Sequence, residues 1–108
     1  MERPEPHIIA DVTFYSTEQG GRRSPTRAEW FGCPCTISGS TKDLWDCRLY
    51  YHAPIEPGET RRVAVVFLSK EAIKIFQKAA HFYLWDLRII GEATVVHSDN
   101  DQFKTRSG

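Results

Sequence analysis

The sequence lacks both a long apolar segment and an excess of charge of one sign. Its longest purely apolar run lies at residues 63–68, far short of the roughly 20 residues that a membrane-spanning helix requires. Lys plus Arg and Asp plus Glu number 14 each in the 108 residues, so the formal net charge is zero. No global field would steer such a chain onto nucleic acid or anionic lipid. We expect no membrane segment, and polyanion binding would need a local basic patch.

Cysteine is sparse, and a targeting signal is missing. The chain has three cysteines, and its first residues contain no apolar stretch of the kind found in signal peptides. An odd and small number of cysteines without a secretory signal fits a reducing compartment better than a disulfide scaffold. We therefore expect a cytoplasmic protein.

Motifs of catalysis and metal binding are also missing. The four histidines (His7, His52, His81 and His97) show no H-x-H or H-E-x-x-H spacing. Cys33 and Cys35 would point to one face of a strand, with Cys47 nearby, but this spacing is not that of a structural zinc site. All three cysteines follow the alternation of their apolar neighbours, which predicts core positions. The alternative is a metal or redox site in which a histidine joins the cysteines. We expect no catalytic residue, no metal and no cofactor.

Alternation of apolar and polar residues is what the sequence has in abundance. In residues 81–96, Phe82 and Leu84 alternate with His81, Tyr83 and Trp85. This period of two in aromatic and β-branched residues is typical of strands with one buried face. After a bend at residues 86–87, the alternation assigns one set to the buried face and a second set to the opposite face. The buried set is Ile89, Gly91, Ala93 and Val95, and the opposite set is Ile90, Glu92, Thr94 and Val96.

The same period predicts further strands at residues 7–14, 30–38, 44–51 and 61–68. Pro34 has no N–H, which indicates an edge strand or a bulge. Ser69 would cap a short helix through Ala80, although an irregular crossover is the alternative. Six strands at short spacing with at most one helix near 70–80 predict an all-β fold: a six-stranded antiparallel closed barrel or sandwich. We expect a single domain over residues 1–97, with residues 1–6 loose and residues 98–108 disordered.

With the strands in place, the chain resembles the C-terminal (third) β-barrel domain of the translation factor elongation factor Tu over about residues 7–96. The first strand leads into Glu18-Gln19-Gly20-Gly21-Arg22-Arg23-Ser24-Pro25, which is similar to the acidic residue, Gly-Gly-Arg and following Pro of the factor. A strand with a central Pro34 comes next, then Pro57-Gly58-Glu59 before an apolar strand. The final hairpin carries Arg88-Ile89-Ile90-Gly91, like the factor's Arg-Thr-Val-Gly.

The departures from that family limit what the resemblance implies. There is no G-x-x-x-x-G-K-[ST] loop for a GTPase cycle, and the factor's middle barrel has no counterpart. Trp85-Asp86-Leu87 replaces its glycine-rich hairpin tip, and the crossover at residues 70–79 looks more helical. In the factor, this domain holds the T-stem backbone of tRNA and docks on the GTPase domain. The resemblance implies such roles for the Gly20–Arg23 loop alone.

Two groups of residues are candidates for binding. Arg22, Arg23 and Arg27 form a tight basic cluster in a polar loop with adjacent glycines. Guanidinium groups suit phosphates and acidic protein surfaces, whereas the alternative is a solvated loop without a partner. Adjacent glycines accept positive φ and close bends, so the loop is expected to have a specified shape.

His81, Tyr83 and Trp85 would form the outer face of the final hairpin, with Arg88 next to the bend. Aromatic residues and arginine are the composition of binding hot spots, and the aromatics could stack on unpaired bases. The alternative is that the short helix or the N-terminal segment covers this stripe.

These features favour a non-enzymatic binding module. Neutral net charge favours a protein partner over structured RNA or tRNA, which remains the other possibility for the partner. The alternative functions are a small enzyme that works through Cys33, Cys35 or Cys47, and an accessory subunit of a larger assembly.

Overall fold

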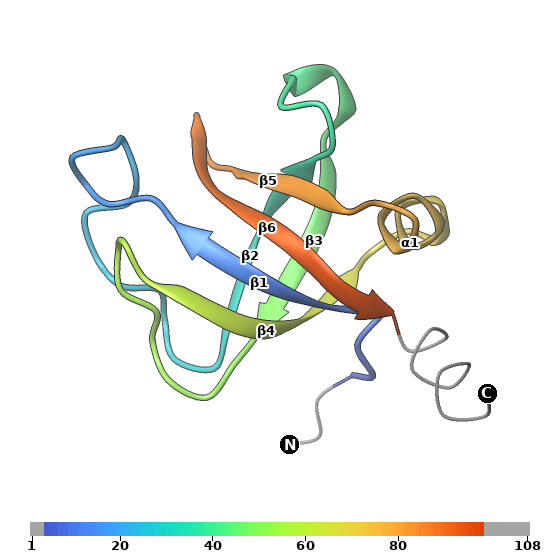
Figure 1. The fold of residues 1–108 in the computed structure, drawn as a ribbon, viewed down its shortest axis with the longest axis horizontal. Helices are drawn as coiled ribbons and strands as arrows, with labels where there is room; N and C mark the ends of the chain where they lie inside the picture. Colours follow the sequence, from blue (N-terminus) through green and yellow to red (C-terminus); the bar gives the residue numbers. More distant parts are fainter. Residues whose placement is uncertain (1–3, 99–108) are drawn as a thin grey trace.

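A computed structural model describes residues 4–98, in which six antiparallel strands close into a barrel (Figure 1). The strands are β1 (Ile8–Phe14), β2 (Trp30–Thr36), β3 (Trp45–Tyr50), β4 (Thr60–Phe67), β5 (His81–Trp85) and β6 (Ile89–Ser98). Their order around the barrel is β1-β4-β3-β2-β5-β6, and β6 pairs with β1 to complete the closure. A 3-10 turn, η1 (Thr41–Asp43), and a helix, α1 (Lys70–Gln77), lie between strands. The all-β prediction is confirmed, and the closed barrel is the form that it takes.

Of the segments expected to be loose or disordered, residues 1–3 and 99–108 lie outside the described residues. Residues 4–6 have no regular secondary structure. Strand β6 continues to Ser98 and pairs there with Ile8, so the barrel extends one residue beyond the expected domain limit.

Alternate side chains of the strands fill the barrel interior, as the period of two predicts. In β1, every second residue from Ile8 to Phe14 is at most 1% exposed. Cys33, Cys35 and Cys47 are buried in the same interior and carry free thiols. Small, weakly polar thiols pack there as apolar groups. The prediction that the three cysteines are core residues is confirmed.

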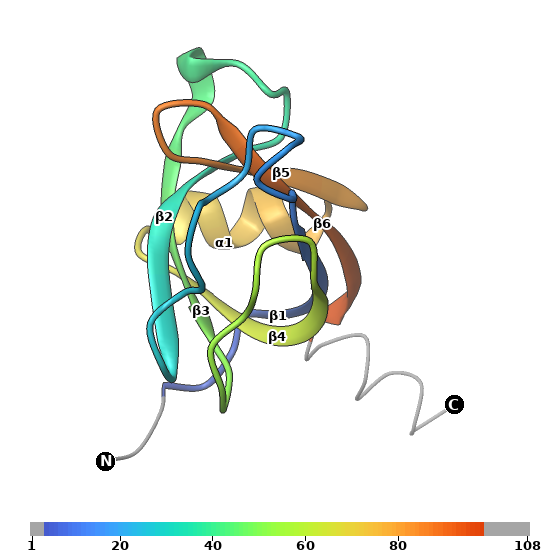
Figure 2. The same ribbon diagram turned by 90° about the vertical axis from the view of Figure 1, so that its left-hand side faces the viewer.

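Helix α1 closes one end of the barrel (Figure 2). The Ser69 side chain accepts a hydrogen bond from the Ala72 N–H at 3.0 Å, the N-cap contact expected from the sequence. The Phe76 ring is fully buried and stacks on Phe67, with ring centroids 4.5 Å apart. It also meets the edge of the Phe82 ring at 5.1 Å. The helix ends three residues before Ala80, and its buried face therefore consists of Ala72 and Phe76.

Two sequence expectations differ from the structure. The pairing of β5 with β6 shifts register between Leu84 and Trp85, so that Leu84 pairs with Gly91 and Trp85 with Ile89. Ile90, expected on the outer face, is consequently the extra residue of a bulge and is only 2% exposed. Pro34 does not lie on an edge strand, because the barrel is closed. It lies in the part of β2 that pairs with β3 but not with β5, since the β2–β5 pairing covers only Cys35 and Thr36. The missing N–H is thus tolerated.

Candidate functional site

The loop between β1 and β2, residues 16–27, has a specified shape at its first turn, and we call it the arginine loop. The N–H groups of Gly20 and Gly21 donate to the carbonyls of Thr17 and Ser16 at 3.1 and 2.9 Å. Gly20 has a φ of +94°, and a Cβ at Gly21 would lie 1.9 Å from the Tyr15 carbonyl oxygen. Only glycine accepts both conditions without strain. The turn therefore places Arg22 at a defined position.

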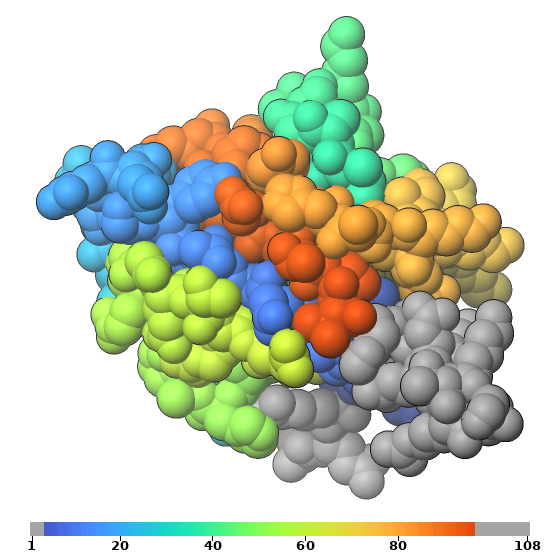
Figure 3. Space-filling view, viewed as in Figure 1, coloured from blue at the N-terminus to red at the C-terminus, as the bar shows by residue number. Residues whose placement is uncertain are grey.

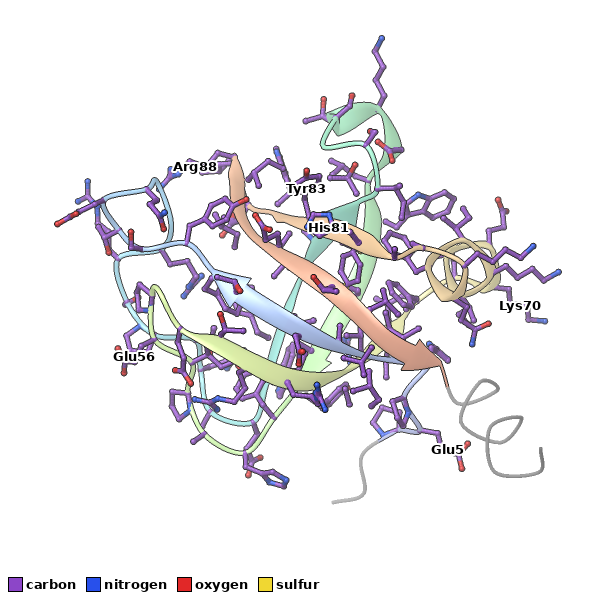
Figure 4. The ribbon with its side chains drawn as sticks, in the orientation of Figure 1. Glu5, Glu56, Lys70, His81, Tyr83 and Arg88 are labelled. Atoms are coloured by element: carbon purple, nitrogen blue, oxygen red, sulfur yellow. The ribbon has the colours of Figure 1, made fainter. Side chains whose placement is uncertain are left out.

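Arg88 ties this loop to the bend between β5 and β6, residues 86–88, which we call the hairpin tip. Its Nε donates to the Gly20 carbonyl, and its Nη2 donates to the Gly21 carbonyl at 3.2 Å. Within the tip, the Asp86 N–H donates to the Arg88 carbonyl at 2.8 Å. Figures 3 and 4 show the arginine loop standing out beside the hairpin, with Arg88 at the tip. Two segments almost 70 residues apart in sequence are thereby fixed against each other.

A surface depression of about 250 Å³ lies between the arginine loop and the hairpin tip. We call it the arginine depression. Its lining includes Arg22, Arg23, Asp86, Leu87 and Arg88. Three guanidinium groups face one carboxylate there, so the local charge is positive although the chain as a whole is neutral. Such a surface suits an anionic group of a partner.

Arg22 contacts both an aromatic ring and the Asp86 carboxylate of the depression. Its guanidinium carbon lies 4.7 Å from the centroid of the Phe31 ring, within cation–π range. Its Nη1 lies 4.0 Å from a carboxylate oxygen of Asp86, and a quarter of the side chain (26%) is exposed. Its Nε is buried and has no hydrogen-bond partner among residues 4–98. Arg22 is thus packed against Phe31 and Asp86, and the exposed quarter of its side chain faces solvent.

Arg27, the third predicted arginine, does not line the arginine depression and contacts Trp30 of β2 instead. Its guanidinium carbon lies 5.0 Å from the centroid of the Trp30 ring, and that of Arg48 lies 5.2 Å from the same ring. The Arg27 carbonyl accepts a hydrogen bond from the Tyr51 hydroxyl at 2.6 Å. Trp30 and Arg48 were not singled out in the sequence. Their contact depends on the β2–β3 register, which opposes Gly32 to Arg48.

The predicted aromatic stripe lies on β5, and its three residues are partly exposed. The His81 and Tyr83 rings meet edge to face at a centroid distance of 4.8 Å. Figure 4 shows both on β5, between Arg88 and α1. Helix α1 directs its buried residues into the barrel end instead. A segment that does approach the stripe is the loop after β2, where a Cβ at Gly39 would lie 3.7 Å from the Tyr83 ring.

Glu92 joins the stripe to Tyr15. The Tyr15 hydroxyl donates to one carboxylate oxygen of Glu92 at 2.8 Å, and His81 Nε2 lies 3.3 Å from the other. Burial, followed by the hydrogen bond to Glu92, raises the pKa of Tyr15 to about 12. The hydrogen bonds from Tyr15 and His81 lower the pKa of Glu92. At neutral pH the Tyr15 phenol is therefore protonated and the Glu92 carboxylate is ionised, so the hydrogen bond between them is retained. Sequence reasoning missed Tyr15 and Glu92 as partners, since only strand pairing brings them together.

A larger groove, of about 440 Å³, lies against the outer faces of β3 and β4. Its arginines are already paired: Arg61 lies 2.6 Å from Glu59, and Arg62 lies 2.9 Å from Asp11. The Arg62 hydrogen bond lowers the pKa of the Asp11 carboxyl, which keeps that ion pair intact at neutral pH. The groove therefore has little uncompensated charge, unlike the arginine depression.

The surroundings of Cys33 and Cys47 disfavour the thiolate form. Hydrogen bonding with Cys47, followed by burial, raises the pKa of the Cys33 thiol well above its usual value. A hydrogen bond from Cys33 favours the Cys47 thiolate, but contact with Cys35 and burial outweigh it and raise that pKa as well. Nucleophilic cysteines need the opposite shift. Among the side chains that the structure describes, those of residues 4–96, no three His, Cys, Asp or Glu groups lie closely enough to hold a metal ion.

The chain matches no protein-family model and no curated protein sequence. Within the described part of the chain, no helix has the length and apolarity needed to cross a membrane.

Proposed function

We propose that this protein is a non-enzymatic binding module, similar to the third domain of elongation factor Tu, that engages a protein partner through the arginine depression. The observation that carries the proposal is that candidate arginines from two segments, the arginine loop and the hairpin tip, lie side by side. Arg22 and Arg23 come from one loop, Arg88 comes from the hairpin tip, and all three line one depression. The Arg88 hydrogen bonds hold the two segments together before any partner arrives. Such preorganisation lowers the entropic cost of binding.

Two features favour a protein over RNA, and a third disfavours a small molecule. The chain has no net charge, whereas RNA binding draws most of its affinity from many cation–phosphate contacts. Asp86 lies within the depression beside the arginines, where it could accept an N–H from a polypeptide backbone. At about 250 Å³, the depression is also smaller than the roughly 300–1,000 Å³ of small-molecule sites. It suits one side chain projecting from a macromolecule.

Structured RNA is the second candidate, favoured by the Gly20–Arg23 loop that resembles the tRNA-contacting domain. An enzyme that works through cysteine is disfavoured by the burial and raised pKa of Cys33 and Cys47.

The test compares two double variants with equal loss of charge. The full chain is used to capture partners, and the affinity of each purified partner and of total tRNA is then measured by calorimetry at 50 and 200 mM salt. In Arg22→Ala/Arg23→Ala we expect the affinity for the protein partner to fall about tenfold or more, as for hydrogen bonds between charged groups. In the control Arg48→Ala/Arg62→Ala, on the outer faces of β3 and β4, we expect less than a twofold change.

Two results would overturn the proposal. Equal losses in both double variants would remove the arginine depression as the site. Tight binding of tRNA that depends on Arg22 and Arg23 and weakens steeply between the two salt concentrations would assign the surface to RNA instead.

A further inference from the structure

Leu87 is an apolar residue at the rim of the arginine depression, and it is 83% exposed. It lies at the hairpin tip between Asp86 and Arg88, and it is more exposed than the other large exposed apolar residues of the described chain, Leu68 at 56% and Ile75 at 39%. The sequence patterns did not single it out. An exposed leucine alone is ordinary on a protein surface, so a second observation is needed.

The backbone of Leu87 supplies that observation. Its φ is +65°, in the left-handed region that glycine and asparagine enter readily but that is strained for leucine. The tip cannot relax easily, because the Asp86 N–H is bonded to the Arg88 carbonyl and the Arg88 side chain is bonded to the arginine loop. Strained residues that the surrounding structure holds in place are typical of binding sites. Here the strain presents an apolar side chain to solvent beside three cations.

We infer that Leu87 is the apolar anchor of the binding surface, and that the partner presents an acidic polypeptide segment in which a carboxylate lies next to apolar side chains. The inference rests on the proposed function and names the chemistry of the partner. Arg22 and Arg23 would bind the carboxylate, since Arg88 is committed to two carbonyls of the loop. Leu87 would insert among the apolar groups of the partner. Arginine is enriched in binding hot spots, and the contacts around a hot spot exclude water from it; the Leu87 contact would do so here.

The small apolar area at the hairpin tip favours a polypeptide over a lipid surface or RNA. Membrane binding by a surface loop scales with its buried apolar area and with attraction to anionic lipid. The tip offers a single exposed leucine, which is too little apolar area to hold a lipid surface. Leucine also provides no flat ring on which a base could stack.

The test selects peptides from a displayed library of random sequences on the immobilised full chain. The wild-type protein is compared with Leu87→Asn, with Arg22→Ala/Arg23→Ala and with a control, Glu29→Asn. Glu29 also has a positive φ, of 78°, but does not line the depression. Circular dichroism verifies that each variant is folded. We expect wild-type selection to enrich peptides with Asp or Glu within a few positions of an apolar residue.

The variants should separate the two parts of the surface. For the best peptide, we expect affinity to fall about tenfold or more in Leu87→Asn, as for the loss of a buried leucine side chain. The same peptide should bind Glu29→Asn as it binds the wild type. The double arginine variant should no longer select acidic residues.

Each other outcome refutes a defined part. Enriched peptides that are acidic without an apolar preference, and that bind Leu87→Asn unchanged, would overturn the role of Leu87 and leave the proposed function standing. If no peptide is enriched but a protein partner still binds in a way that depends on Arg22 and Arg23, the inference of an acidic segment is wrong and the proposed function stands. Binding of total tRNA or of phosphatidylserine vesicles through the same residues, without peptide enrichment, would overturn both the inference and the protein partner.

Discussion

Replacing Leu87 by asparagine should make the barrel more stable while it removes the apolar anchor. The prediction follows from two properties of one residue, its positive φ of 65° and its 83% exposure. A residue chosen for stability alone would be glycine or asparagine at such a φ. A gain in stability together with a loss of binding is the trade-off expected where a functional residue is held under strain.

The expected change in the free energy of unfolding is the relief of backbone strain minus the apolar contact that is lost with the leucine side chain. The left-handed conformation costs an ordinary residue about 1–2 kcal/mol, and asparagine avoids most of this cost. A fully buried leucine is worth about 1.5–3 kcal/mol, but Leu87 is so exposed that only a few tenths, ~0.3 kcal/mol, would be lost. The net gain in the free energy of unfolding is then ~1 kcal/mol. Leu87→Gly should gain less, because glycine loses about 0.5–1 kcal/mol more on folding.

Urea denaturation, followed by tryptophan fluorescence and by circular dichroism, measures this gain. We expect a higher midpoint at an unchanged slope, and a melting temperature about 4–8 °C higher. Glu29→Asn should stabilise the fold by a similar amount, because its φ is also positive. A Leu87→Asn protein that is less stable than the wild type, beside a stabilised Glu29→Asn, would refute the reasoning, since Leu87 would then serve the fold.

Three further predictions concern the Arg88 hydrogen bonds, the contacts of Glu92 and the thiols. Arg88→Lys keeps the charge, but lysine has no planar fork with which to donate to both loop carbonyls. We expect the free energy of unfolding, measured by urea denaturation, to fall by ~1 kcal/mol. An unchanged free energy would contradict a stabilising role for the Arg88 hydrogen bonds. The Tyr15 hydroxyl has its pKa raised to about 12 in the fold, against about 10 in an unfolded chain. Its contribution to stability is therefore complete below pH ~10 and is lost as the pH rises toward ~12; in Glu92→Gln an absorbance titration should show a lower Tyr15 pKa, and an identical titration would refute the contact. Cys33 and Cys47 should react with a thiol reagent only as fast as the barrel unfolds, because both are buried with raised pKa values; rapid modification of the native protein near neutral pH would favour the cysteine enzyme instead.

Most of the fold was predictable because alternation is a local property. Strands β1 to β5 begin and end within about two residues of the predicted ranges, and Ser69 caps α1 as expected. Ile90 shows the limit of that reasoning. A bulge inserts one residue, so that Ile90 and Gly91 are buried in succession, and its position depends on how β5 and β6 pair. Nothing in the hairpin's own sequence specifies that register shift.

The candidate binding residues were named from composition, but their grouping was not. Arg22, Arg23 and Arg88 each stood out as cations near turns, whereas their common depression follows from the hydrogen bonds that Arg88 makes to the Gly20 and Gly21 carbonyls. Arg27 stood in the same cluster and turns instead to Trp30.

Along the regular parts of the strands, the sequence by itself determined which side chains face the interior, because a strand's period of two assigns each residue to a face without knowledge of its neighbours. It thereby also determined that the cysteines are packed as core residues. Only the tertiary structure decided which loops meet, which arginine is committed to backbone carbonyls, and that Leu87 is held at a positive φ beside them. These properties arise from contacts between segments far apart in the chain, and their free energies depend on the register and closure of the barrel as a whole.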